Sequence, residues 1–376
     1  MRSRLVLGLV LVLYLGGVAR AEDPAADWKF TPEHLVPFWT AQTMYGESLL
    51  FVREKPDGDA VASLLFEPTR ILSVTNSAGD VVYEEGRDYV WRAGSRSLSL
   101  PAGSRITCKT PEDLRCAPGS QQYALTRRDG QGEIRFGGGL EYHGMQTLVT
   151  YEHKGSWPTQ MPTLAREQLP RTLTLLKEKK PLTVALLGDS ISTGCNASGW
   201  AHGAPFQPPY QDLFVTNLER KYGSAITLKN FAVGGTDTSW GLANIGKVSE
   251  VKPDLVILAF GMNDSAGRPA QDYQANIRAM VEAVRKEVPH AEFILIATMV
   301  GNPDWVTLKQ ELFPQYRDAL ADLCGSGIAL ADVTTVWTEF HRRKQDRDLT
   351  GNGVNHPNDF GHRVYAQVLS ALLIEQ

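Results

Sequence analysis

After Pro181, short apolar runs alternate with helical patterns to the end of the chain. The expected strands are residues 183–187, 225–230, 254–260, 292–298 and 328–331. The expected helices in this part are residues 209–222, 271–287, 305–324 and 360–374. The four apolar residues 184–187 are too few for a stable lone helix and suit a strand that is buried on both faces, and residues 255–260 show a second pattern of this kind. The alternation predicts an α/β fold over residues 181–376, with a parallel sheet between two layers of helices.

The first expected strand runs into Gly188-Asp-Ser190. Gly188 allows a sharp exit from the strand, which places Ser190 at a strand-to-helix turn. A hydroxyl at such a turn can project into a crevice, while the free N–H groups of the following helix point at the atom that it attacks. Serine nucleophiles are usually presented in this way. On these residues alone, Asp189 and Ser190 could equally be helix caps.

Three later motifs bear on this choice. They are Asn230-Phe-Ala-Val-Gly-Gly235 and Gly261-Met-Asn263-Asp264, which follow the second and third strands, and His356-Pro-Asn-Asp before the last helix. In a three-layer domain with the flavodoxin-like strand order 2-1-3-4-5, the carboxyl ends of the first three strands meet at one crevice. That order would bring Ser190, Gly235 and Asn263 together.

With these four motifs in this order, the chain resembles the SGNH (GDSL-type) hydrolases over roughly residues 181–376. The resemblance implies a serine esterase with Ser190 as nucleophile and His356 as base. A serine hydroxyl needs such a base, and imidazole titrates near neutrality. The resemblance also implies an oxyanion hole formed by Ser190, Gly235 and Asn263, whose donors would stabilise the charge that develops on the carbonyl oxygen. It implies no metal and no other cofactor.

The sequence departs from the family pattern beside His356. The family's acid is an Asp three residues before the His, and Gly353 occupies that position here. Asn352, Asp348 or a backbone carbonyl could orient the imidazole instead, and the sequence leaves these alternatives open. We expect no carboxylate within residues 348–359 to be essential.

Residues 1–21 have the pattern of a secretory signal peptide, with Arg2 and Arg4 before an apolar run and Ala19-Arg-Ala21 at the expected cleavage site. A membrane anchor is the less favoured alternative, because the run falls short of the roughly 20 residues that span a bilayer. We therefore expect a secreted or periplasmic protein. The segment carries three of the 38 basic residues and none of the 42 acidic ones, so its removal changes the net charge from −4 to −7. Nucleic acid is an unexpected partner for such a chain.

Residues 22–155 contain short β-rich runs between Gly, Asp, Asn and Pro residues. They predict an antiparallel β-sandwich or jelly-roll domain, which is either a sugar-binding module or a scaffold that shapes the cleft. Residues 156–180 are expected to be a proline-containing linker. Cys108 and Cys116 enclose a short polar loop, and an exported protein favours a disulfide between them. The pairing of Cys195 and Cys324 is left open.

The substrate is less constrained. In its expected export, its negative charge and its β domain before an SGNH-like domain, the chain resembles carbohydrate esterases that remove acetyl groups from polysaccharides. Trp200, His202, Trp240 and Trp305 fall in or near loops at the crevice and are candidate substrate contacts, with ordinary packing as the alternative for each aromatic side chain. A lipase- or thioesterase-like acyl hydrolase and a catalytically decayed carbohydrate-binding protein are the alternative functions.

Overall fold

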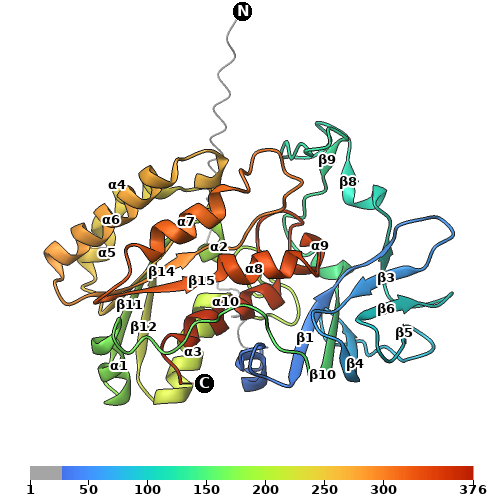
Figure 1. Ribbon diagram of the computed structural model, residues 1–376, viewed down its shortest axis with the longest axis horizontal. Helices are drawn as coiled ribbons and strands as arrows, with labels where there is room; N and C mark the ends of the chain where they lie inside the picture. Colours follow the sequence, from blue (N-terminus) through green and yellow to red (C-terminus); the bar gives the residue numbers. More distant parts are fainter. Residues whose placement is uncertain (1–27, 376) are drawn as a thin grey trace, which may run out of the picture.

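The computed structural model describes residues 28–375, so the expected signal peptide, residues 1–21, lies outside the described residues. An α/β region and a β-rich region lie side by side in it (Figure 1). The α/β region has one sheet with the strands β11 (Leu182–Gly188), β12 (Ile226–Asn230), β13 (Leu255–Ala259), β14 (Glu292–Ala297) and β15 (Ile328–Asp332). All neighbouring strands are parallel, in the order β12-β11-β13-β14-β15. The predicted flavodoxin-like order is confirmed.

Helices cover both faces of this sheet. The helices of the described chain are α1 (Pro170–Lys177), α2 (Ser190–Thr193), α3 (Tyr210–Tyr222), α4 (Thr238–Asn244), α5 (Gly246–Glu250), α6 (Ala270–Glu287), α7 (Leu312–Ala321), α8 (Val333–His341), α9 (Asp346–Leu349) and α10 (Asp359–Ala371). Short 3-10 helices are η2 (Pro32–Leu35), η3 (Glu112–Leu114), η4 (His143–Met145) and η5 (Asp264–Ala266). Figure 1 shows α4 to α7 on one side of the sheet and α1, α3 and α10 on the other. The predicted three-layer architecture is thus confirmed.

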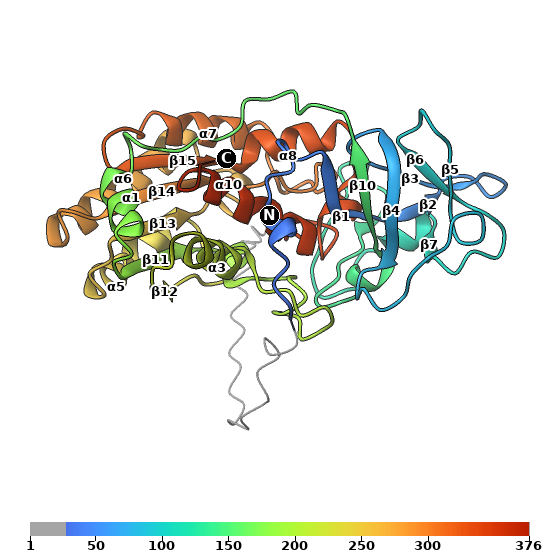
Figure 2. The same ribbon diagram turned by 90° about the horizontal axis from the view of Figure 1, so that it is seen from below.

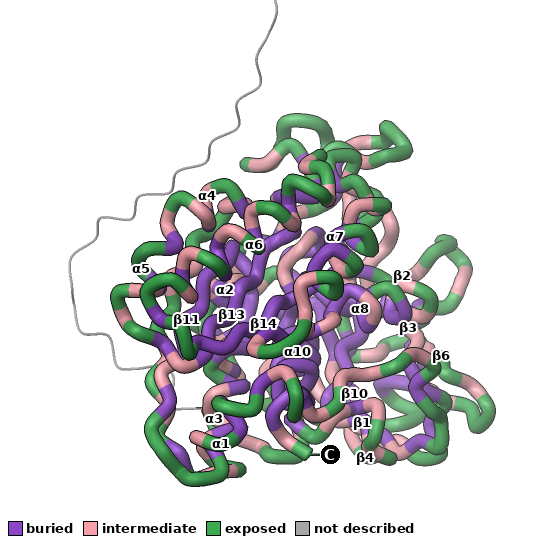
Figure 3. Tube along the Cα trace, turned by 60° about the vertical axis from the view of Figure 1, so that its left-hand side comes forward, coloured by how far each residue is buried: buried purple, intermediate pink, exposed green. Residues whose placement is uncertain are grey.

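The inner strands β11, β13 and β14 are buried because alternate side chains point to opposite helical layers, whereas β12 at the edge of the sheet is half-buried to exposed. Val184 and Leu186 of β11 belong to the core that includes α3, α8 and α10. Ala185 and Leu187 belong to the core beneath α5, α6 and α7. All four side chains are fully buried, and Figure 3 shows β11, β13 and β14 as buried strands.

One predicted helix is only partly correct. The apolar pattern predicted a helix over residues 305–324, but α7 begins at Leu312. The preceding residues extend along the β-rich region instead: the N–H of Val306 donates to the carbonyl of Thr126, and Arg127 and Trp305 form an isolated bridge. Tertiary pairing of the backbone replaces the first helical turns here.

The β-rich region contains three small sheets. Their strands are β1 (Thr43–Leu49), β4 (Pro68–Asn76) and β10 (Thr147–His153) in the first, β2 (Phe51–Arg53), β3 (Ala60–Ser63), β5 (Val90–Trp91), β6 (Ser97–Leu100) and β7 (Cys108–Lys109) in the second, and β8 (Arg115–Cys116) and β9 (Glu133–Ile134) in the third. The pairs are antiparallel except for β2 with β7. This confirms the expected β-rich class, whereas the boundaries 22–155, 156–180 and 181–376 stay predictions.

The two regions share apolar contacts. Leu49 and Phe51 of the β-rich region lie in the same core as Phe340 of α8 and Phe360 of α10. After β10, the chain crosses to α1 as the extended connector that the prolines predicted (Figure 2). Among residues 28–375, no helix has both the length and the apolar content to cross a bilayer.

The predicted disulfide between Cys108 and Cys116 is wrong. Both residues are free thiols, as are Cys195 and Cys324. Cys108 lies on β7 and Cys116 on β8, which belong to two different sheets. Each strand's own pairing fixes the direction of its cysteine, and a disulfide requires the two side chains to face each other closely.

Candidate active site

Ser190 begins α2 directly after the first strand of the parallel sheet. A Cβ at Gly188 would lie 2.6 Å from the carbonyl oxygen of Ala259, so only glycine allows β11 to turn here. Asp189 caps the helix, since its Oδ1 accepts the N–H of Ile191 at 3.0 Å. The capping role that was open for both residues belongs to Asp189, which leaves the Ser190 side chain for another partner.

That partner is His356. Its Nε2 atom lies 2.8 Å from the Oγ atom of Ser190, although the two residues are 166 positions apart in the chain. His356 stands on the loop between α9 and α10, as predicted. The structure thus brings the predicted nucleophile and the predicted base into hydrogen-bonding contact.

Asn196, which sequence analysis did not single out, contacts the other side of the imidazole. Its Oδ1 atom lies 2.9 Å from Nδ1 of His356. Its Nδ2 group donates to the carbonyls of Gly137, Gly139 and Gly351 at 3.3, 3.1 and 3.1 Å. The backbone of Asn196 has a φ of 65°, in the left-handed region that asparagine tolerates better than most residues. Nothing in the spacing of the sequence relates Asn196 to His356.

The two residues proposed to orient His356 point elsewhere. Oδ1 of Asn352 accepts the backbone N–H groups of Val354, Asn355 and His356 at 2.9, 2.9 and 3.2 Å, and so shapes the loop. Asp348 accepts two other backbone N–H groups, that of Leu50 at 2.7 Å and that of Gln345 at 3.0 Å. The interpretation named the wrong side chains, because the Asn196 contact depends on the fold and not on spacing from His356.

Burial lowers the pKa of His356 to about 4. The side chain that contacts Nδ1 is the uncharged amide of Asn196 and not a carboxylate. It therefore does not counteract the loss of hydration that disfavours the imidazolium. The imidazole is therefore neutral at pH 7 and can accept a proton. His362 in α10 is also neutral, since burial lowers its pKa to about 3.

The predicted oxyanion residues follow β12 and β13, beside β11 in the sheet. Gly235 has a φ of 77°, which favours glycine. A Cβ at the neighbouring Gly234 would lie 3.7 Å from Cβ of Ser190, so this loop packs against the nucleophile. Nδ2 of Asn263 donates to the carbonyl of Thr236 at 2.8 Å. These contacts tie the second and third motifs to the first at one edge of the sheet.

The four candidate substrate contacts differ in exposure. Trp200 is 39% exposed and follows the helix that begins at Ser190, and His202 is exposed on the same loop. Trp240 is half-buried against the core under α6, and Trp305 is half-buried against the β-rich region. Packing accounts for the latter two, which leaves Trp200 and His202 free to meet a ligand.

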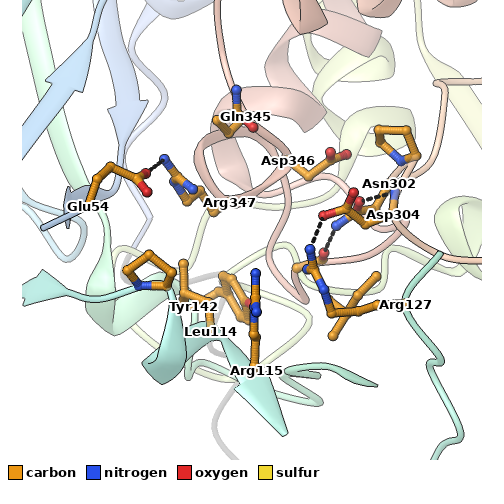
Figure 4. Close-up of a pocket in the computed structure, with 14 residues that line it drawn as sticks. Glu54, Leu114, Arg115, Arg127, Tyr142, Asn302, Asp304, Gln345, Asp346 and Arg347 are labelled. Atoms are coloured by element: carbon orange, nitrogen blue, oxygen red, sulfur yellow. Dashed lines mark hydrogen bonds and ion pairs between the residues drawn. The ribbon is translucent and has the colours of Figure 1, made fainter. Parts of the chain in front are cut away.

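A polar pocket of about 220 Å³ lies at the junction of the two regions (Figure 4). Residues of both regions line it, among them Arg115, Arg127, Asp304, Asp346 and Gly353. Arg127 and Asp304 form an ion pair of 3.0 Å at its edge. Because Gly353 belongs to the loop that carries His356, the pocket adjoins the catalytic loop from the side of the β-rich region.

Comparison with known proteins places the four motifs in a family. Residues 186–364 match the model of the GDSL-like lipase/acylhydrolase family. This part of the chain is a GDSL-like lipase/acylhydrolase domain. The description of this family, lipase/acylhydrolase, agrees with the expected enzyme class, a carboxylic ester hydrolase. No curated protein matches the sequence.

Several solved structures are similar to this domain at low identity. A two-domain esterase active on acetylated mannans is 20% identical, with a TM-score of 0.45 over 56% of this chain and 54% of that one. An acetyl xylan esterase is 21% identical, with a TM-score of 0.41 over 51% of this chain and 100% of that one. A lipase from a goat rumen metagenome is 20% identical, with a TM-score of 0.42 over 52% of this chain and 99% of that one. The chain thus spans about half of the first of these proteins.

Proposed function

We propose that this protein is an exported serine esterase that hydrolyses O-acyl esters, specifically acetyl esters of carbohydrates. The observation that carries the proposal is the 2.8 Å hydrogen bond between Ser190 and the neutral imidazole of His356. A hydroxyl in contact with an unprotonated base is the arrangement that nucleophilic ester cleavage needs. The proposal of export rests on the signal-like pattern of residues 1–21.

In the proposed reaction, the Ser190 hydroxyl gives its proton to Nε2 of His356 while its oxygen bonds to the ester carbonyl carbon. The imidazolium then gives this proton to the alcohol oxygen, the bond between that oxygen and the carbonyl carbon breaks, and the acyl group stays on Ser190. Water enters in place of the alcohol and loses a proton to His356 as its oxygen adds to the acyl carbon. The acid leaves when that proton returns to the Ser190 oxygen.

The N–H groups of Ser190 and Gly235 and the side chain of Asn263 are the proposed donors to the developing oxyanion. One proton of the Asn263 amide is used on the carbonyl of Thr236, and an amide has a second proton for the substrate. Donors that are already held in place need no reorganisation during the reaction. Each is expected to be worth about 10²- to 10³-fold in kcat.

We assign the carbohydrate part of the substrate to the polar pocket beside the catalytic loop, which Gly353 of that loop lines and which Ser190 and His356 do not. Arginine and carboxylate groups, such as Arg115 and Asp346 in its lining, exchange hydrogen bonds with sugar hydroxyls. A long acyl chain would instead gain affinity from apolar walls. The similar acetyl mannan and acetyl xylan esterases agree with this substrate class without establishing it.

A series of esters of one alcohol, from acetate to laurate, tests the acyl group. The proposal expects kcat/KM to fall as the acyl chain lengthens, whereas a lipase- or thioesterase-like enzyme would show the opposite order.

Acetylated xylan and mannan fragments test the alcohol part of the substrate. Arg115→Ala is expected to raise KM for these fragments and to leave hydrolysis of a small acetate ester unchanged. Arg87→Ala, an exposed arginine outside the pocket, is the matched control.

A further inference from the structure

We infer that Asn196 is the positioning residue of this site: its uncharged amide fixes the tautomer and the orientation of His356, and the β-rich region holds that amide in place. The inference rests on the proposed function and adds a member to its catalytic machinery. It also assigns the β-rich region a part in catalysis that does not depend on sugar binding.

The hydrogen bonds of Asn196 determine which of its two terminal atoms faces the imidazole. Its Nδ2 group meets three carbonyl oxygens, which can only accept, so these contacts require the NH2 group. The oxygen must therefore be the atom that faces Nδ1 of His356. Because Oδ1 can only accept, Nδ1 must carry the proton and Nε2 must be free to accept from Ser190.

Two separate chain segments hold the amide in this orientation. Gly137 and Gly139 come from the β-rich region, and Gly351 comes from the loop that carries His356. The N–H of Gly137 also donates to the carbonyl of Asn352 at 3.1 Å, which links the same β-rich segment to the His356 loop. Asn196 is only 5% exposed, so water does not compete freely for these bonds.

Glycine is required in this segment for packing. A Cβ at Gly137 would lie 2.8 Å from a ring carbon of Tyr142, and the Tyr142 hydroxyl in turn donates to the carbonyl of Arg135 at 3.0 Å. The run Gly137-Gly-Gly139 thus lets the backbone approach Asn196 closely with its carbonyls. If the amide were flipped, the Asn196 oxygen would face three carbonyl oxygens, which is unfavourable. The flipped amide, which would pair with the opposite tautomer of His356, is therefore disfavoured.

An uncharged positioning residue has a consequence that a carboxylate would not have. A carboxylate at this place would favour the imidazolium and raise the pKa of His356, whereas the amide orients the ring and leaves it neutral. His362 is a titratable neighbour that would lower the pKa of His356 further if it were charged, but burial keeps it neutral. The site thereby keeps its base active in more acidic solution.

Side-chain nitrogen NMR of histidine-labelled protein tests the tautomer without any substrate. In the native protein, Nδ1 of His356 is expected to be protonated and Nε2 unprotonated, with the signals assigned by their loss in His356→Gln. Asn196→Gly removes the amide and keeps the φ of 65° accessible, so the fold is expected to survive. In this variant the tautomer preference should disappear. Asn217→Ala is the matched control, because the Nδ2 group of Asn217 donates to the hydroxyl of Ser370 in α10 and does not contact the ring.

Kinetics provide the second readout. Asn196→Gly should lower kcat by about 10²- to 10⁴-fold with little change in KM, because a ring without its partner is seldom in the productive tautomer. Asn196→Asp should move the acidic limb of the kcat profile upward by about one to three pH units, since a carboxylate beside the ring favours the imidazolium. Asn217→Ala should show neither effect.

An unchanged tautomer in Asn196→Gly, or an unmoved acidic limb in Asn196→Asp, would overturn the inference even if the protein is an esterase. If native protein lacks esterase activity but shows the predicted tautomer and its loss in Asn196→Gly, the proposed function fails and the positioning contact stands. The two failures are therefore distinguishable.

Discussion

Lys344 and Glu47 form a completely buried ion pair between the α/β region and the β-rich region. Nζ of Lys344 lies 2.6 Å from Oε1 of Glu47, and both side chains are 0% exposed. Glu47 also accepts the N–H of Leu65 and the hydroxyl of Tyr151, at 2.9 and 2.6 Å. The pair lies just before α9 and the catalytic loop, so it anchors the segment that leads to His356.

Removal of one partner should destabilise the protein strongly. Lys344→Met leaves the Glu47 carboxylate buried without its counter-charge, and we expect a loss of about 3–5 kcal/mol in the free energy of unfolding. The double variant Glu47→Gln with Lys344→Met leaves no unpaired charge and should recover a large part of this loss. Chemical denaturation of the three proteins measures both effects. A single variant that is as stable as the native protein would show that the pair is not a structural anchor.

Ser190 is expected to be essential for turnover. Ser190→Ala removes the nucleophile and little else, because the hydroxyl contributes one hydrogen bond at a site that is 9% exposed. The expected loss in kcat for a small acetate ester is about 10⁴-fold or more. Circular dichroism and thermal unfolding should match the native protein. A folded variant that retains full activity would refute the assignment of the nucleophile.

The pH dependence should reflect the lowered pKa of His356. The base works only when it is neutral, so activity is lost as the pH falls through its pKa. Burial places that value at about 4, well below the ordinary value of 6.5. We expect kcat/KM to hold its plateau below pH 6 and to fall only near pH 4. An acidic limb between pH 6 and 7 would contradict this account of the site.

Acid unfolding is the necessary control for this profile. His34 and His362 have folded-state pKa values of about 3, also lowered chiefly by burial. When the folded pKa is lower than the unfolded one, the unfolded chain binds more protons as the pH falls from about 6.5 toward 3, and stability decreases over that window. Circular dichroism at each pH separates this loss of fold from the titration of His356.

The sequence was sufficient for the parts of the fold and site that depend on local patterns. Short apolar runs identified four of the strands, and the more polar run 225–230 identified the edge strand β12. The sheet order followed from the rule for doubly wound α/β folds. The contact between Ser190 and His356 followed from the resemblance of their two motifs to those of a known family. Each of these signals lies within a short stretch of the chain.

The parts that failed depend on contacts between distant segments. Asn196 acquires its role from the carbonyls of Gly137, Gly139 and Gly351, which no spacing in the sequence relates to it. The early turns of the helix expected from residue 305 were replaced by pairing with Thr126. Cys108 was assigned to a disulfide from the short loop and the expected export, although the direction of its side chain depends on the pairing of β7 with β2.

The last prediction distinguishes structural from catalytic roles among the carboxylates near His356. Asp348 is 5% exposed and accepts the backbone N–H groups of Leu50 and Gln345, so its carboxylate joins α9 to the β-rich region. Asp348→Asn should lose at least one of these bonds and about 1–3 kcal/mol of stability, because a buried donor is left without an acceptor.

In the same variant, kcat should stay within a few-fold of the native value at a temperature where the protein is folded. His356→Ala should lower kcat by about 10⁴-fold or more. Asp359→Ala should also keep kcat within a few-fold of the native value. Oδ1 of Asp359 accepts the N–H of Ser198 at 2.8 Å and does not contact His356. Steady-state rates with a small acetate ester, measured beside thermal unfolding, compare the three. If a folded Asp348→Asn enzyme is as inactive as His356→Ala, Asp348 takes part in catalysis and Asn196 does not suffice to orient the base.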